Sequence, residues 1–322
     1  MSAFRTAAAV VDGLGEDQLD LKIGTNTLKD LKGVGPKTAA VIVQAHKGQV
    51  PEYLAKLEQH LAELVPMADD VADFRAALKG DLHLHSDWSD GGSPIREMAE
   101  AAIALGHEYM ALTDHSPRLT VANGLSPERL EKQLDVVAAL NEELAPFRIL
   151  TGIECDINVD GSLDQTDELL GRLDVVVASV HSDLRADSSA MTARMLTAVA
   201  YPHTDVLGHC TGRLVIGRKQ RNGTQKPRPE STFDAGAVFA ACVEFGTAVE
   251  INSRPERLDP PRRLLTLAVE LGCEFSIDTD AHAPGQLDWQ YNGVERAIEC
   301  GVDRDRVVNT RSADELLAWT EG

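Results

Sequence analysis

The sequence predicts an α/β protein in which a distorted seven-stranded (β/α)7 barrel follows a small all-α domain. Two observations predict this fold. Residues 80–322 contain seven strand-like runs separated by helical or helix-length stretches, a pattern typical of parallel strands joined by helices. Residues 1–79 contain helical patterns, which give way to a strand near Leu78-Lys79-Gly80. We therefore expect two domains, at 1–79 and 80–322.

The composition narrows the range of functions. The 322 residues carry a net charge of −20, and 4% of them are aromatic. Few aromatic side chains argue against a surface that stacks nucleobases, and strong acidity argues against a general polyanion-binding protein. The charge is unevenly distributed, because residues 1–79 carry a net charge of −2 and residues 80–322 carry −18.

The cysteines and the apolar runs predict a cellular location. The five cysteines are isolated and form no CxxC pair, which favours a reducing cytosol over a disulfide framework. The apolar run near the N-terminus is too short for a signal peptide, and no segment reaches the roughly 20 apolar residues of a membrane span. We expect a cytoplasmic protein outside the membrane, and the sequence makes no prediction of its oligomeric state.

In the first domain, residues 27–48 predict two helical segments joined by Gly33-Val34-Gly35. Pro36 suits the first turn of the second helix, and apolar residues recur after it at helical spacing. The segment resembles the helix-hairpin-helix DNA-binding motif, in which hairpin glycines let backbone N–H groups approach a phosphate. The resemblance implies DNA contact by Gly33, Gly35 and Lys37. The alternative is a tight turn that only packs the domain.

In the second domain, strands and helix boundaries alternate along the sequence. The predicted strands are 81–86, 108–115, 148–158, 174–182, 205–210, 247–253 and 274–282. The predicted helix starts are Ser93-Pro94 and Ser126-Pro127, and the predicted helix ends are Gly106, Gly246, Gly272 and Gly301. Polar N-caps followed by proline, and glycines after a helical stretch, are typical of these positions.

Metal-preferring side chains fall toward the C-terminal ends of the predicted strands, where parallel barrels place their chemistry. His83 and His85 are two residues apart, so their rings lie on one face of the first strand. The other candidates are Asp90, His115, Glu154, His181, His209, Asp280 and His282. Burying so many polar groups without metal would leave them competing for few partners. The nine residues predict a multinuclear site, and imidazole with carboxylate suits Zn, Mn or Fe.

The motifs around these residues resemble those of the polymerase and histidinol phosphatase (PHP) domain family. They are DLHLHSDWSDG, ALTDHS, TGIECDI, ASVHS, GHCTGR, EINSRPERLD and DTDAH, and they cover essentially all of 80–322. Asp90 and the GHCTGR motif are most similar to the PHP domain of bacterial family X DNA polymerases, which also follows a helix-hairpin-helix region. The chain leaves no room for a nucleotidyltransferase domain, so polymerase activity is not expected.

The resemblance implies three divalent metal ions. One ion would take His83, His85, Glu154 and Asp280, a second Glu154, His181 and His209, and a third Asp90, His115 and His282. Glu154 would bridge two ions, and Glu154 and Asp280 are predicted to be catalytic through the ions they hold. Clustered divalent ions can activate water, hold a phosphoryl oxygen and stabilise a leaving alkoxide. The sequence nominates no clear general acid.

A basic segment follows the fifth predicted strand. Six basic residues and no acidic residue lie between Thr211 and Pro229, namely Arg213, Arg218, Lys219, Arg221, Lys226 and Arg228. We interpret the segment as a rim that receives substrate phosphate, with Arg213 in direct contact. The alternative is a solvated loop. Arg257, and less strongly Arg254, are further predicted phosphate contacts, unless they pair with acids of the rim.

The predicted function is a metal-dependent phosphoesterase. The hairpin and the basic segment favour the 3′ end of DNA, as for a 3′–5′ exonuclease or end-processing enzyme. The general acidity favours a small phosphorylated metabolite, such as a nucleotide or histidinol phosphate. A DNA-binding module with structural metals is a weaker alternative, because the ligand set is complete. An amidohydrolase-type deaminase is disfavoured, because the fourth predicted strand has no lysine.

Overall fold

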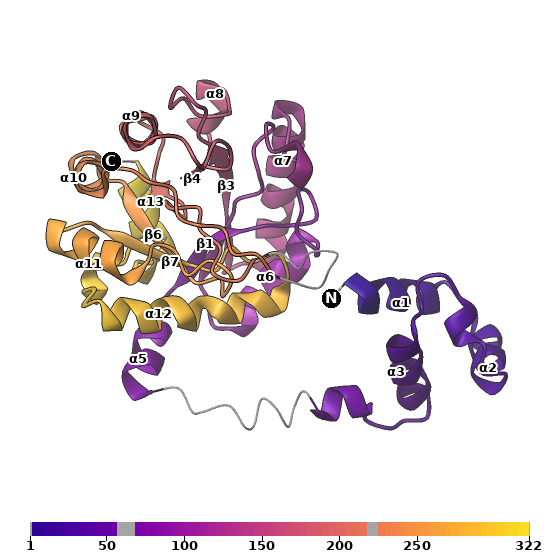
Figure 1. Cartoon of the computed structure of the whole chain (residues 1–322). Coiled ribbons are helices and arrows are strands. Elements are labelled where there is room, and N and C mark those ends of the chain that lie inside the picture. Colours follow the sequence, from indigo (N-terminus) through magenta and orange to yellow (C-terminus); the bar gives the residue numbers. More distant parts are fainter. Residues whose placement is uncertain (1, 57–67, 218–224, 322) are drawn as a thin grey trace. The chain divides into compact units, whose positions relative to one another are not determined.

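The barrel predicted for the second part of the chain is present in the structure, a computed structural model that describes residues 2–56, 68–217 and 225–321 (Figure 1). Seven parallel strands pair in chain order. They are β1 (Gly80–Leu84), β2 (Tyr109–Leu112), β3 (Arg148–Asp156), β4 (Val175–Ser179), β5 (Val206–Leu207), β6 (Ala248–Asn252) and β7 (Phe275–Asp278). A parallel bridge between Leu84 and Ala281 joins the two edges of the sheet. The predicted fold class is therefore confirmed.

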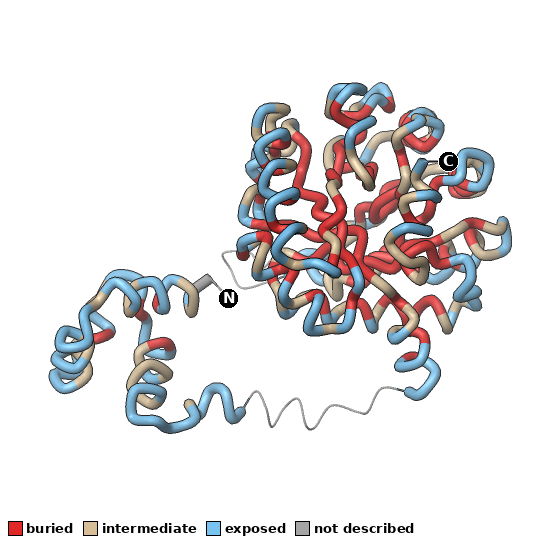
Figure 2. The backbone as a smooth tube through the Cα atoms, turned by 180° about the vertical axis from the view of Figure 1, so that it is seen from behind, coloured by how far each residue is buried: buried red, intermediate tan, exposed pale blue. Residues whose placement is uncertain are grey.

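Helices surround these strands on the outside. The helices of the barrel domain are α5 (Asp69–Ala77), α6 (Ile95–Ala104), α7 (Pro127–Leu144), α8 (Asp167–Leu170), α9 (Ser188–Val199), α10 (Ala235–Phe245), α11 (Arg262–Leu271), α12 (Gln290–Glu299) and α13 (Ala313–Thr320). Short 3₁₀ turns are η2 (Thr120–Ala122), η3 (Pro284–Trp289), η4 (Arg304–Arg306) and η5 (Val308–Thr310). The strands are buried, whereas the helices alternate between buried and exposed faces (Figure 2). Among the described residues, no helix has both the length and the apolar character needed to cross a membrane.

Several predicted helix boundaries are observed. The Ser126 side chain accepts a hydrogen bond from the Arg129 amide at the start of α7, as expected for an N-cap. Gly246 and Gly272 follow α10 and α11 with φ angles of 72° and 88°, a left-handed conformation that glycine adopts without steric cost. At α6 the predicted start is shifted, because Pro94 occupies the N-cap position and the helix begins at Ile95.

One end of the barrel is covered by apolar packing, and the other end carries the polar candidate residues. Leu316 of α13 packs in one apolar cluster with Tyr109, Val175, Val206 and Ala248, all of which lie at the beginning of their strands. Helix α13 therefore covers the N-terminal ends of the strands. The polar candidate residues lie at the opposite, C-terminal ends.

The chain divides into two compact units, Met1–Met67 and Ala68–Gly322. This division precedes the predicted boundary after Lys79, because α5 belongs to the barrel unit. Val71, Phe74 and Leu78 are buried in the same apolar cluster as barrel residues. The change from a helical to a strand pattern near residue 79 thus indicates where an element ends, whereas burial of the apolar face of α5 decides to which unit it belongs.

The first unit contains α1 (Ser2–Asp12), α2 (Glu16–Gly24), η1 (Leu28–Asp30) and α3 (Pro36–His46). The predicted helix before the glycine turn is only the 3₁₀ turn η1. Gly33 has a φ angle of 98°, and a Cβ atom there would lie 2.7 Å from the Thr6 side chain. Gly35 precedes α3 in an extended conformation. The glycines therefore form a tight turn between η1 and α3, and Lys37 is exposed in the first turn of α3.

Candidate metal centre

The strand ends and the loops that follow them carry the candidate residues. Of the nine, only His83 and Glu154 lie within strands, because the prediction extended β1, β2, β4, β5 and β7 too far. The backbone leaves the β conformation at His209 and Asp280, whose φ angles are 20° and 52°. Gly208 permits the close approach of β5 to β4, because a Cβ atom there would lie 2.3 Å from Ser179 Oγ.

Glu154 lies at the centre of the site. It is buried, and its two carboxylate oxygens face imidazole nitrogens at distances of 2.8–3.5 Å. Oε2 lies beside His83, His85 and His115, and Oε1 lies beside His181 and His209. One carboxylate on β3 thus contacts side chains from β1 and from the loops after β2, β4 and β5.

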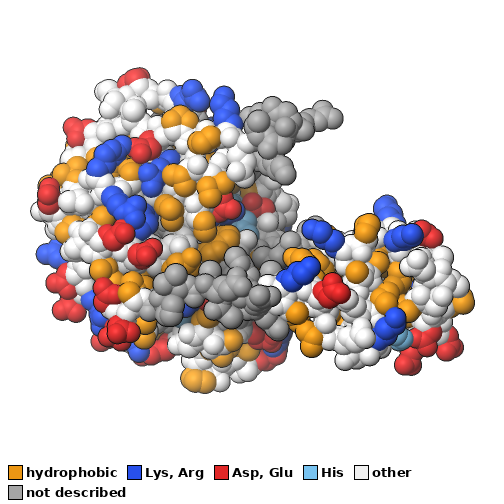
Figure 3. All heavy atoms as spheres, turned by 60° about the horizontal axis from the view of Figure 1, so that its bottom comes forward, with side chains coloured by type: hydrophobic (Ala, Val, Ile, Leu, Met, Phe, Trp, Pro, Cys, Tyr) orange, Lys and Arg blue, Asp and Glu red, His pale blue; other side chains and the backbone are white. Residues whose placement is uncertain are grey.

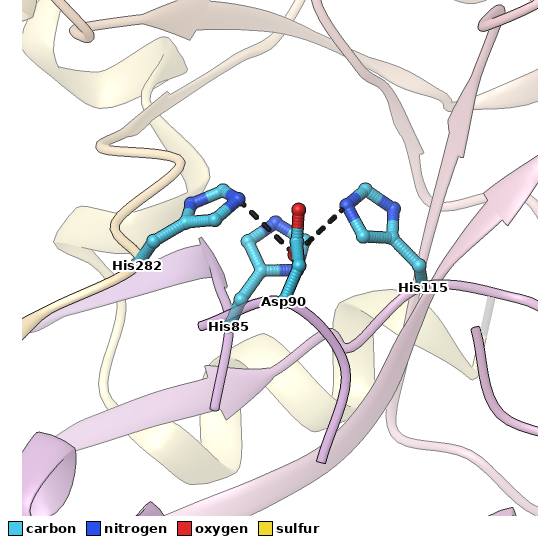
Figure 4. Close-up of side chains that lie close together, drawn as sticks. All are labelled: His85, Asp90, His115 and His282. Atoms are coloured by element: carbon cyan, nitrogen blue, oxygen red, sulfur yellow. Dashed lines mark ion pairs between the residues drawn. The ribbon is translucent and has the colours of Figure 1, made fainter. Parts of the chain in front are cut away.

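Two further carboxylates complete the arrangement. Asp90 Oδ1 lies 3.4 Å from His115 Nε2 and 3.3 Å from His282 Nε2, and Figure 4 shows both histidines pointing toward Asp90, with His85 beside it. Asp280 Oδ1 lies 3.6 Å from His85 Nε2. The structure therefore brings together all nine residues that the sequence singled out.

Three sets of ligand atoms are close enough to share an ion, with all atoms of a set within 4.8 Å of one another. The sets are His83, His85 and Asp280; His115, Glu154 and His181; and His85, Asp90, His115 and His282. They overlap with the three predicted ligand sets. In the second set His115 takes the place predicted for His209, although His209 Nε2 also lies 2.8 Å from Glu154 Oε1.

The unpaired nitrogens fit a metal site. His83 Nε2, His181 Nε2 and both ring nitrogens of His85 are buried and have no hydrogen-bond partner among the described residues. Buried polar atoms are normally hydrogen-bonded, and neutral imidazole is a common ligand of divalent transition metals. A set of imidazoles and carboxylates without thiolates therefore fits Zn, Mn or Fe ions.

Electrostatics keep the carboxylates of the site ionised. Burial alone would raise the pKa of Glu154, but His83, His181 and His115 together lower it well below its usual value. Burial likewise opposes ionisation of Asp280, and Arg254 and Arg257 hold its pKa well below the usual range. Both side chains are therefore available as anionic ligands.

Comparison with known proteins identifies this region. Residues 81–229 match the PHP domain. This part of the chain is a PHP domain. The match confirms the family that the sequence motifs indicated, and it includes seven of the nine candidate residues, from His83 to His209.

Two relatives and one solved structure place the PHP domain among known proteins. "DNA polymerase/3'-5' exonuclease PolX" of Bacillus subtilis is 43% identical over 242 residues, which are 75% of this chain and 41% of that protein, so the chain spans less than half of this relative. A probable phosphatase of Thermoanaerobacter sp. (strain X514) is 26% identical over 71% of this chain and 89% of its own length. Histidinol phosphate phosphatase of Lactococcus lactis, solved with Zn, L-histidinol and phosphate, has a TM-score of 0.50 at 19% identity, over 69% of this chain and 92% of that chain. This structural likeness supports the assignment of the fold.

Two buried acids that the sequence analysis did not select orient histidines of the PHP domain. Glu250 on β6 lies with Oε1 2.6 Å from His83 Nδ1, and its Oε2 accepts the His209 backbone N–H. Asp156 Oδ1 lies 3.1 Å from His181 Nδ1. Such contacts fix the ring in an orientation that would let Nε2 face a bound metal ion. The sequence signal for Glu250 is a single acid within the otherwise apolar run Ala248–Ile251.

The predicted phosphate contacts separate into two kinds. Arg257 lines the cavity above the centre, its Nε donates to Asp280 Oδ2 over 2.8 Å, and its buried Nη1 has no hydrogen-bond partner among the described residues. Arg213 instead donates to the backbone carbonyls of Arg257 and Leu258, and it does not line that cavity. Its geometry is that of a residue that positions Arg257.

The basic segment is partly visible. Arg228 lines the same cavity, and its Nε donates to the Gly212 carbonyl. Leu214 and Arg228 form an antiparallel bridge that closes the base of the segment. Arg218, Lys219 and Arg221 lie outside the described residues, so the structure adds nothing to their predicted role.

Proposed function

We propose that this chain is a metal-dependent phosphoesterase whose PHP domain hydrolyses phosphate esters. The observation that carries the proposal is the buried carboxylate of Glu154 surrounded by imidazoles whose free nitrogens converge on it. Burying this many ionisable groups is costly unless they hold cations. The exonuclease and phosphatase names of the relatives support the same class of reaction.

Three divalent ions are proposed, held by the residue sets predicted from the sequence. The first set is His83, His85, Glu154 and Asp280, the second Glu154, His181 and His209, and the third Asp90, His115 and His282. Zn in the Lactococcus lactis structure supports Zn as one candidate, beside Mn and Fe. Such ions acidify water, polarise phosphoryl oxygens and stabilise a leaving alkoxide.

The residues of the chain itself organise this chemistry. Glu250 and Asp156 hold His83 and His181 in the orientation in which each Nε2 faces the centre. Arg257 keeps Asp280 ionised and offers its unpaired Nη1 to a phosphate oxygen. Arg213 fixes the backbone of Arg257 through its carbonyl. No general acid is assigned.

The preferred substrate is the 3′ end of a DNA strand. The 3′-5′ exonuclease named in the Bacillus subtilis relative supports it, and so does the glycine turn before α3 in the first unit. The test is an assay of the full chain, loaded with Mn²⁺ or Zn²⁺, on single-stranded DNA with a 3′-hydroxyl end. We expect release of nucleoside monophosphates, which stops when a chelator is added.

The second candidate is a small-molecule phosphatase. Its support is the Thermoanaerobacter relative, a probable phosphatase that this chain matches over 89% of its length. The same assay with p-nitrophenyl phosphate and glycerol 3-phosphate separates the two functions. Hydrolysis of small esters alone favours this candidate, and no hydrolysis of any substrate by metal-loaded protein contradicts the phosphoesterase proposal.

The DNA contact of the first unit has its own prediction. Replacing exposed Lys37 by Glu in the full chain should weaken single-stranded DNA binding and lower the slope of log affinity against log salt by about one, as expected for one lost phosphate contact. Fluorescence anisotropy of labelled DNA at several salt concentrations measures both. Lys47→Glu makes the same charge change at an exposed position after α3. Equal effects of the two variants would contradict a specific hairpin contact.

A further inference from the structure

The cavity above the metal centre is larger than a phosphate group requires. It has a volume of about 530 Å³, and its lining includes Asp90, His115, His181, Asp280 and His282. Cavities of roughly 300–1,000 Å³ hold ligands of the size of a drug or cofactor. Most of this space therefore lies beyond the phosphate, and it is available to the organic group of a phosphate ester.

Part of the cavity wall is apolar. Leu119, Val121 and Ala122 come from the loop after β2, and Leu214 and Ile216 come from the loop after β5. Val121 is 92% exposed and Ile216 is 44% exposed. Single exposed apolar side chains are common on protein surfaces, but here two separate loops place them around the same cavity as the metal-ligand candidates. Figure 3 shows histidine and acidic side chains in a hollow with hydrophobic side chains beside it.

The loop that carries Val121 is firmly held. The Arg118 backbone N–H donates to Asp164 Oδ2 over 2.5 Å, and its guanidinium donates to Asn158 Oδ1 over 2.9 Å. Asn123 Nδ2 donates to the Trp88 carbonyl over 3.0 Å. A Cβ atom on Gly124 would lie 1.9 Å from the Ser116 carbonyl oxygen, so glycine is required at this turn. These contacts fix the loop in a conformation in which the Val121 side chain is exposed.

The loop that carries Ile216 is attached to the next loop along the barrel. Leu214 exchanges backbone hydrogen bonds with Arg228, and the Val215 amide donates to the Glu256 carbonyl over 2.7 Å. Glu256 also lines the cavity; its side chain is 41% exposed, and its Oε2 lies 3.6 Å from Nε of Arg254, a second residue of the lining. The cavity therefore combines an apolar wall with a partly exposed carboxylate that can accept a hydrogen bond.

We infer that this cavity binds the organic group of the substrate, and that this group is a nucleoside or a similar apolar ring that carries hydrogen-bond donors. The inference rests on the proposed phosphoesterase function, because the metal centre and Arg257 are taken to hold the phosphate end. Val121 and Ile216 contact the ring, and the Glu256 carboxylate accepts from a hydroxyl or amino group. Val121 and Ile216 are therefore residues that determine specificity.

The test compares two ligands that differ in the organic group. Hydrolysis-resistant methylene phosphonate analogues of thymidine 5′-phosphate and of glycerol 3-phosphate are titrated into the metal-loaded full chain by calorimetry. We expect the thymidine analogue to bind at least about tenfold more tightly, the size of effect that small apolar contacts give. Val121→Ser and Ile216→Ser should each reduce this preference severalfold, and the double variant should abolish it.

Val159→Ser is the matched control, because Val159 is 58% exposed on the loop after β3 and does not line the cavity. It should leave the preference unchanged. Equal affinity of the parent for both analogues, or an unchanged preference in the double variant, overturns the inference. If the protein prefers the thymidine analogue but hydrolyses no ester, the assignment of the cavity stands and the proposed phosphoesterase function is contradicted.

A further arm separates free nucleotides from strand ends. The thymidine analogue and a short single-stranded oligothymidylate compete for the parent protein and for the double variant. If the cavity receives a terminal nucleoside, the substitutions weaken binding of both ligands. If only the free analogue loses affinity, the occupant is a mononucleotide.

Discussion

Glu154→Gln should lower the hydrolysis of phosphate esters by about three orders of magnitude, the largest effect expected of any single substitution in this chain. The carboxylate contacts five histidines and is the proposed ligand of two ions. An amide removes the negative charge and turns one oxygen into an NH₂ donor. Clustered ions supply several kcal/mol of transition-state stabilisation, and about 1.4 kcal/mol corresponds to a factor of ten in rate. Steady-state rates with p-nitrophenyl phosphate measure the loss.

Metal content decides whether this loss has the proposed cause. Elemental analysis after dialysis should find fewer ions per chain in Glu154→Gln than in the parent, while circular dichroism of the metal-free proteins shows the same secondary structure. Glu295→Gln is the control, because Glu295 is exposed on α12, on the outside of the barrel. If Glu154→Gln keeps full activity and binds as many ions as the parent, the proposal that the Glu154 carboxylate is an essential metal ligand is wrong.

The barrel and the convergence of the candidate residues could be predicted because they depend on the order of elements. Alternation predicts that His83 and His85 face the same way, although β1 ends at Leu84 between them. Parallel strands bring their C-terminal ends to one rim. These relations place the strand ends, and the residues that directly follow them, at one rim before the loop conformations are known. The nine candidate residues therefore come together as predicted, while their role as ligands stays a prediction.

Features that depend on loop conformation could not be predicted. Asp280 lies after the end of β7 and has a positive φ angle, whereas the sequence analysis placed it within the strand. Arg213 precedes Arg257 by 44 residues, and its hydrogen bond to the Arg257 carbonyl depends on how two loops meet. The composition of the basic segment indicated only positive charge. The sequence therefore predicted arginines near the site but not which arginine supports another.

Glu250 could be predicted only in part, because strand periodicity indicates on which face of the sheet its side chain lies but not which residue it contacts. The structure shows the partner, His83 Nδ1 at 2.6 Å, and this contact leads to the second large expected effect. Glu250→Gln should weaken metal binding by about 10–100-fold, the usual result of removing a group that orients a metal-binding histidine. Activity measured against the concentration of added Mn²⁺ should show the midpoint shifted upward by this factor.

The shape of that curve distinguishes positioning from direct participation. If Glu250 acts through His83, saturating Mn²⁺ should restore most of the parental rate, since the ring can still reach the ion at a cost in affinity. If the rate at saturation stays several orders of magnitude low, Glu250 contacts the ions or the reacting groups itself, and the positioning role is wrong. Glu244→Gln, at an exposed position on α10, should leave both the midpoint and the rate unchanged. A shift confined to metal affinity is expected when the two histidines that Glu250 contacts, His83 and His209, are ligands.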